Sequence, residues 1–200
     1  YVDGWKPDER RTAVYVGGEQ GETYLRSLDL PVERYGRGPI GHDRLLIVAP
    51  GMDGSGGKHE EAVRQWIEDG GRALAVGLDE EQANALVPFD VSMERGEHIG
   101  VWFESDGTGS PLAGIGPADV HNRDPRGLPL VSGGATPVGN GVLAVSEDAN
   151  VVFCQLAPWK FSPLTQMNIK RTFRRVAVLF SRLLGNLGAA GSTPLLSRFA

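Results

Sequence analysis

The chain alternates between two spacings of apolar residues, and these spacings predict an alternating series of strands and helices. Short apolar runs at residues 12–17, 44–49 and 72–77 are typical of strands that are buried on both faces. A polar, glycine-containing turn follows the first two runs, and helical stripes of apolar residues then occupy residues 21–30 and 58–69. Strands and helices in this order predict right-handed crossovers, a parallel sheet and therefore an α/β fold.

The rest of the chain predicts an edge strand, an irregular insertion, a hairpin and a closing helix. Residues 32–36 are interpreted as an edge strand, and residues 141–158 as two strands joined by a polar turn. An irregular insertion over one end of the sheet is expected at about 79–131, with a strand at 98–105 inside it, where apolar residues alternate. Residues 168–187 have an apolar stripe opposite Lys and Arg residues, which predicts an amphipathic helix.

Composition narrows the class of protein. The 200 residues and the apolar content of 40% predict a single domain over residues 1–200 with a packed core. The net charge of -5 argues against nucleic-acid binding, and no apolar run is long enough to cross a membrane. Cys154 is the only cysteine, so no intramolecular disulfide can form. Cysteine usage therefore does not indicate whether the protein is secreted or cytoplasmic. The first residue is Tyr1, and we expect the chain to be a segment of a longer polypeptide.

Three phrases of the sequence carry a family resemblance. They are VAPG at residues 48–51, WIEDGGRALAVG at 66–77 and NIKRTFRRVAVLFSRLLGNLG at 168–188. Their order and spacing resemble the class I glutamine amidotransferase-like fold, in the non-catalytic form known from the trimerisation domain of family 42 β-galactosidases and other multidomain glycoside hydrolases. This resemblance implies a three-layer, flavodoxin-like sandwich with a mostly parallel sheet, a C-terminal β-hairpin and a closing helix.

The same resemblance points to the turn where catalytic members carry their nucleophile. In those members a cysteine follows the strand that matches RALAVG, on a tight turn flanked by glycines. Here the turn reads Gly77, Leu78, Asp79, Glu80, Glu81. Leu78 cannot act as a nucleophile, and Asp79 has neither a following glycine nor an evident activating base. The resemblance therefore implies the fold without the amidotransferase chemistry, and no catalytic residue is assigned.

Other candidate residues have ordinary structural roles as alternatives to functional ones. Cys154 lies within a predicted strand and is expected to be buried and inert. The glycine-rich stretch 51–57 is interpreted as a permissive loop, since it lacks the pattern of a phosphate-binding loop. The densest polar cluster is expected either to cap turns or to contact a ligand or another domain; it comprises Asp119, His121, Asn122, Arg123 and Asp124. No metal site is predicted, because no second His or Cys stands at ligand spacing, and no cofactor is expected.

Three functional hypotheses follow. The first is an accessory, non-catalytic domain of a carbohydrate-active enzyme that acts through packing, oligomerisation or shaping a neighbouring active site. Its partners would be other domains of a parent glycoside hydrolase or further copies of the chain, with carbohydrate as a possible ligand. The second is a free-standing hydrolase that uses residues 119–124. The third is a sugar-binding module. An exposed Trp102 or Trp159 beside the crevice at the carboxyl ends of the parallel strands would favour it.

Overall fold

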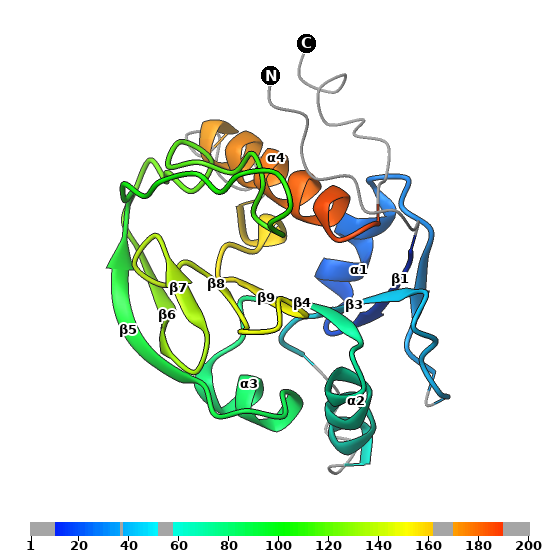
Figure 1. Ribbon diagram of the computed structural model, residues 1–200. Coiled ribbons are helices and arrows are strands. Elements are labelled where there is room, and N and C mark those ends of the chain that lie inside the picture. Colours follow the sequence, from blue (N-terminus) through cyan, green and yellow to red (C-terminus); the bar gives the residue numbers. More distant parts are fainter. Residues whose placement is uncertain (1–10, 37, 52–57, 162–169, 190–200) are drawn as a thin grey trace.

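The computed structural model describes residues 11–36, 38–51, 58–161 and 170–189, and a seven-stranded sheet runs through the middle of the molecule (Figure 1). Its strand order is β2-β1-β3-β4-β9-β8-β7. The first five of these strands are parallel, whereas β8 and β7 run antiparallel to their neighbours. The strands are β1 (Thr12–Val16), β2 (Val32–Arg34), β3 (Arg44–Val48), β4 (Arg72–Val76), β7 (Thr136–Val138), β8 (Leu143–Val145) and β9 (Val151–Cys154).

Helices cover both faces of the sheet, so the molecule has three layers (Figure 1). One face carries α1 (Glu19–Arg26), the short 3-10 helix η1 (Pro158–Phe161) and α4 (Lys170–Asn186). The other face carries α2 (Lys58–Glu68) and α3 (Glu80–Leu86). Alternate strand residues point to opposite layers, as Leu45 and Leu46 do in β3. The structure thus confirms the predicted α/β, flavodoxin-like fold with a mostly parallel sheet.

The closing helix packs against its own chain. The apolar side chains of α4 are buried in the same cluster as alternate residues of the parallel strands. Phe180 makes edge-on ring contacts with Tyr24 of α1 and with Trp159 of η1, at centroid distances of 5.9 and 6.0 Å. The buried residues of this stripe are Phe173, Val176, Leu179, Phe180, Leu183, Leu184 and Leu187. The predicted helix is confirmed, and its stripe is buried within the chain; residues 168 and 169 lie outside the described part.

The hairpin near the C-terminus is confirmed and extended. β8 and β9 pair antiparallel, as the sequence predicted, and β7 adds a further antiparallel strand at the edge. Asp148 shapes the turn between β8 and β9: it accepts hydrogen bonds from the Ser146 hydroxyl and from the backbone N–H of Asn150. β9 therefore joins the parallel sheet beside β4, and the hairpin closes one end of it.

The prediction of a strand at residues 98–105 is wrong. β5 spans Ser92–His98 and pairs antiparallel with β6 (Arg126–Gly133), while no strand is formed from residue 99 to 125. The alternation is real, because Val101 and Phe103 pack against the core and Trp102 is 81% exposed. However, no strand pairs with this segment, and the Ile99 carbonyl accepts a hydrogen bond from the N–H of Asn122 instead.

The middle of the chain also contains regular structure that the sequence did not predict. α3 begins directly after β4, and the β5–β6 ribbon follows it. The side chain of Asn84 in α3 holds the start of this ribbon, because it donates to the Val91 carbonyl and accepts from the Val91 N–H. Among the described helices, none has the length and apolarity needed to span a bilayer.

Candidate functional site

The turn after β4 begins with Gly77 at a φ of +64°, and neither Leu78 nor Asp79 after it is a nucleophile on a strained backbone. Leu78 is only 2% exposed, and Asp79 is the N-cap of α3 with φ -84° and ψ 177°. Asp79 and Gln82 form a capping box, in which the Asp79 carboxylate accepts from the Gln82 N–H at 2.9 Å and the Gln82 side chain accepts from the Asp79 N–H at 3.2 Å. At this turn, Asp79 therefore caps a helix, whereas a catalytic member would hold its nucleophile there on a strained backbone.

The described surroundings of this turn contain no histidine that could act as an activating base. A side chain added at Gly77 would first meet the Ala157 methyl group and the Lys160 ammonium group, each 3.6 Å away. The shallow pocket beside the turn has a volume of about 310 Å³, and the described residues that line it include no histidine or cysteine. Its ionisable lining residues are Glu60, Asp79 and Glu81, which carry one sign of charge. Among the described lining residues, a thiol placed here would find no histidine to deprotonate it.

Cys154 is buried, as the sequence predicted, and we expect it to be inert. It is the last residue of β9, with no exposed surface, and its thiol donates to the Leu156 carbonyl at 3.4 Å. Burial raises the pKa of this thiol to about 12. The thiol stays protonated at neutral pH, so it supplies no nucleophile.

The polar cluster at 119–124 lies against α4. The Asp119 carboxylate accepts from Arg182 at 2.7 Å and from the Gly116 N–H at 2.9 Å. Arg175 donates to Nδ1 of His121 at 2.9 Å, which requires this nitrogen to be unprotonated. The Arg123 N–H donates to the hydroxyl group of Thr172.

Two members of this cluster make fewer contacts. Asn122 is fully buried, and neither atom of its side-chain amide has a partner among the described residues. Asp124 is half-buried. The polar partner of His121 is thus an arginine rather than a carboxylate, so the base-and-carboxylate pair of the hydrolase hypothesis is not formed there. A ligand or interdomain role for these residues stays a prediction.

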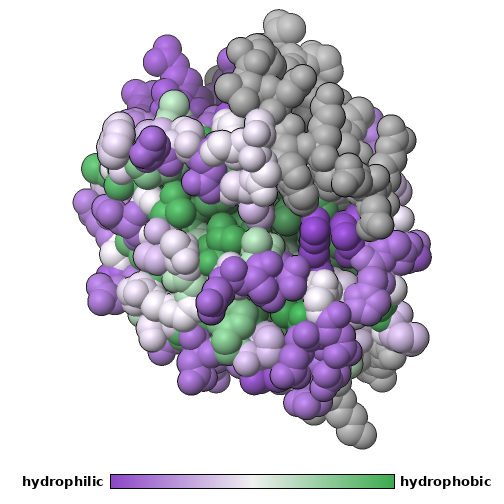
Figure 2. Space-filling model, in the orientation of Figure 1, coloured by the Kyte–Doolittle hydropathy of each residue, from purple (hydrophilic) through white to green (hydrophobic). Residues whose placement is uncertain are grey.

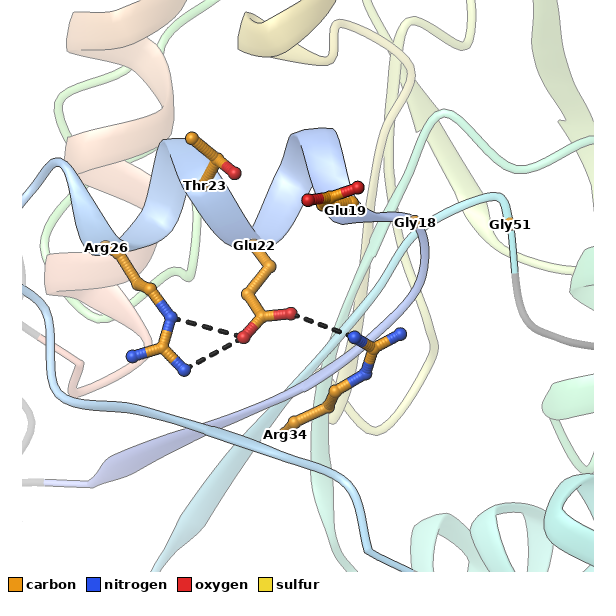
Figure 3. A pocket seen from close by; sticks show the side chains of 7 residues that line it. All are labelled: Gly18, Glu19, Glu22, Thr23, Arg26, Arg34 and Gly51. Atoms are coloured by element: carbon orange, nitrogen blue, oxygen red, sulfur yellow. Dashed lines mark hydrogen bonds and ion pairs between the residues drawn. The ribbon is translucent and has the colours of Figure 1, made fainter.

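A second pocket lies at the carboxyl ends of β1 and β3, where the strand order reverses (Figure 3). Because α1 and α2 leave these strands toward opposite faces of the sheet, a crevice opens between them, as is usual at such a reversal. The pocket has a volume of about 500 Å³. It is lined by Gly18, Glu19, Glu22, Thr23, Arg26, Arg34 and Gly51.

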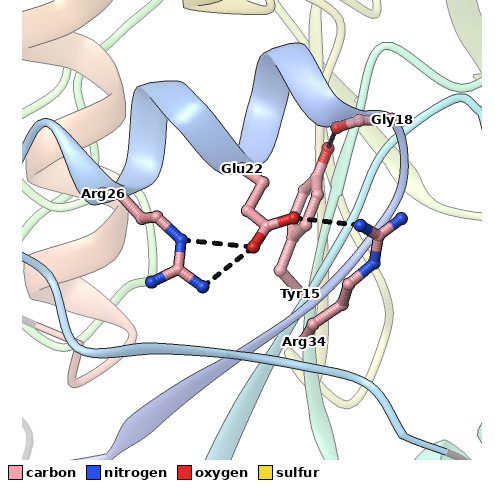
Figure 4. A network of polar contacts seen from close by, with 5 residues as sticks. All are labelled: Tyr15, Gly18, Glu22, Arg26 and Arg34. Carbon is pink, nitrogen blue, oxygen red and sulfur yellow. Dashed lines mark hydrogen bonds and ion pairs between the residues drawn. The ribbon is translucent and has the colours of Figure 1, made fainter.

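Glu22 is the centre of a fixed charge network in this pocket (Figure 4). One of its oxygens accepts from Arg26 at 2.8 and 3.2 Å, and the other accepts from Arg34 at 3.2 Å. Beside this network, the Tyr15 hydroxyl donates to the Gly18 carbonyl at 2.8 Å. Burial and the nearby Glu22 carboxylate raise the pKa of Tyr15 to about 12, while Arg34 lowers it, so the phenol remains a donor at neutral pH.

Sequence reasoning did not single out this pocket. Two local signals were available: the glycine pair 17–18 directly after a predicted strand, and the four-residue spacing of Glu22 and Arg26. Of the glycine-rich stretch 51–57, only Gly51 belongs to the described residues, so its interpretation as a permissive loop is not tested. Among the described residues, no group of three or more His, Cys, Asp or Glu is placed to hold a metal ion.

Comparison with known proteins supports the fold. A glutamine amidotransferase from Thermotoga maritima superposes with a TM-score of 0.55 at 13% identity, covering 92% of this chain and 100% of that one. PurLQS from Thermotoga maritima gives a TM-score of 0.48 at 13% identity, with 86% and 99% of the two chains covered. No protein-family model matches the sequence. No curated protein matches it either. The chain thus has a class I glutamine amidotransferase-like fold, and at this identity the likeness concerns the fold alone.

Proposed function

We propose that this chain is an accessory, non-catalytic domain of a carbohydrate-active enzyme. The observation that carries the proposal is the turn after β4, where a helix cap at Asp79 stands in place of a nucleophile. The parent class, a multidomain glycoside hydrolase, comes from the sequence phrases at 48–51, 66–77 and 168–188. The structural neighbours do not bear on this parent class.

The surface of the domain supports a role in packing. The outer face of α4 carries exposed arginines, and its sequence contains no acidic residue. Val178 is 36% exposed on this helix. The exposed arginines are Arg171, Arg174, Arg175 and Arg182. An acidic surface of a neighbouring domain would complement this face.

Figure 2 shows an apolar area of the surface, in contrast to the basic face of α4. In that view apolar residues gather in the middle of one face, and hydrophilic residues border them along the described part of that face. Apolar surface with a polar border is typical of regions that contact other proteins. Contact through such surfaces is how a domain without chemistry could stabilise an oligomer or shape a neighbouring active site.

The complete protein that contains this chain tests the proposal. It should hydrolyse a chromogenic glycoside, and Asp79→Asn should leave kcat within about twofold because Asp79 only caps a helix. A complete protein without glycosidase activity would contradict the proposed parent class. A glycosidase activity that is lost on Asp79→Asn would contradict the non-catalytic role.

A charge reversal tests the packing role in the same protein. Arg171→Glu should lower the melting temperature of the complete protein by about 2 °C or more, while the isolated chain keeps its own melting temperature. The matched control is Glu61→Arg, on the exposed surface of α2 at the opposite face of the sheet. Equal effects of both reversals on the complete protein would refute docking through α4.

A further inference from the structure

The pocket at the reversal of strand order has a floor made of backbone. The Gly18 N–H donates to the Pro50 carbonyl at 2.9 Å, which holds the loops after β1 and β3 together. Gly51 has a φ of +95°, and a Cβ there would lie 3.0 Å from the Cα of Gly18. These close approaches keep side chains off the floor, so the backbone of both loops stays open to a small molecule.

The walls of the pocket are charged and held in place. The Glu22 side chain is only 16% exposed, and both of its oxygens are occupied by guanidinium groups. Arg34 uses one nitrogen for Glu22 and is itself 55% exposed, so its other N–H groups remain available as donors. Figure 3 shows Glu19 and Arg34 at different heights along the pocket, with Gly18 and Gly51 to one side of both.

The balance of charge selects the class of ligand. Two carboxylates, Glu19 and Glu22, face two guanidinium groups, Arg26 and Arg34. A phosphate would be repelled by the carboxylates, and a metal ion by the guanidinium groups. A ligand with several hydroxyl groups fits both, because one hydroxyl can donate to Glu19 while another accepts from Arg34.

We infer that this pocket binds a neutral, polyhydroxylated ligand of the size of one or two sugar rings. The pocket volume of about 500 Å³ is within the range of small-molecule sites. Hydroxyl recognition follows from the pocket itself, whereas the choice of carbohydrate among polyols rests on the proposed function. No aromatic side chain is among the described residues that line the pocket, so these residues offer no ring stacking and we expect an affinity that is roughly millimolar.

A titration followed by amide NMR tests this inference on the chain itself, with glucose, galactose and inorganic phosphate as separate probes. A hexose should shift the amide signals of Gly18, Glu19 and Gly51 and should saturate in roughly the millimolar range. Arg34→Gln and Glu19→Gln should each weaken binding about tenfold, because each removes a charge-assisted hydrogen bond. Glu19→Gln leaves the ion pairs of Glu22 intact, so it separates ligand contact from loss of the network.

The matched control is Arg44→Gln. Arg44 starts β3 at the other end of the strand, where it pairs with Glu33 at 2.9 Å, and its loss should leave hexose binding unchanged. Absence of saturable shifts with either hexose, equal binding by Arg34→Gln, or tighter binding of phosphate than of hexose would overturn the inference. These results do not depend on glycosidase activity of the complete protein, so failure here and failure of the proposed function are separate outcomes.

Discussion

Replacing Phe180 with alanine is expected to lower the free energy of unfolding by about 3–5 kcal/mol. Phe180 has no exposed surface and holds α4 against Tyr24 and Trp159 through edge-on ring contacts. Its removal leaves a cavity and breaks two ring contacts. Urea denaturation at equilibrium measures the change, which is a large part of the net stability of a typical domain, about 5–15 kcal/mol.

The control for this prediction lies two residues earlier on the same helix. Val178 is 36% exposed, and Val178→Ala should change the free energy of unfolding by no more than about 0.5 kcal/mol. Similar small effects of both substitutions would mean that α4 is not docked on its own sheet. The stripe would then face another domain.

Gly141→Ala is expected to destabilise the protein by about 2–6 kcal/mol. Gly141 has a φ of +81°, and a Cβ there would collide with the Val131 carbonyl oxygen and lie 2.7 Å from the Val131 nitrogen. Both atoms belong to the backbone of β6, and the Val131 N–H donates to the Gly141 carbonyl, so no side-chain rotation relieves the collision. Backbone strain and overpacking each cost about 1–3 kcal/mol.

Thermal unfolding of Gly141→Ala beside Gly107→Ala checks this prediction. A Cβ at Gly107 would have no atom within 4 Å, so this second substitution should be nearly neutral. Equal melting temperatures for the two variants would contradict the close approach of the β7–β8 turn to β6.

The sheet and its helices could be predicted from the sequence where each element buries a continuous or periodic apolar set. The strands β1, β3 and β4 are of this kind because they are covered on both faces, and α1 and α2 each have a single apolar stripe. The segment 98–105 has the period of a strand without a partner strand, and periodicity alone does not report pairing. α3 was not predicted because it is only seven residues long. Its one sequence signal is the capping box at its start, which is local and short.

The candidate site could be predicted only in part, because its contacts join distant residues. The missing nucleophile after β4 is visible in the sequence, since it depends on a single turn. The Glu22–Arg34 ion pair depends on β2 lying beside β1 with Arg34 opposite Tyr15, which local patterns do not fix. Likewise, the composition of residues 119–124 marks a polar cluster, but its contact with Arg175 and Arg182 follows from how α4 docks.

The central claim, a glutamine amidotransferase-like fold without its chemistry, is tested most directly by the release of ammonia from glutamine. The native chain and Asp79→Cys are assayed together, because position 79 is exposed and would present a thiol at the turn after β4. We expect no turnover above the buffer blank from either protein, since the pocket at this turn has no histidine among its described lining residues and the backbone is unstrained. Ammonia release by the native chain, or by Asp79→Cys at a rate that thiol alkylation abolishes, would contradict the account.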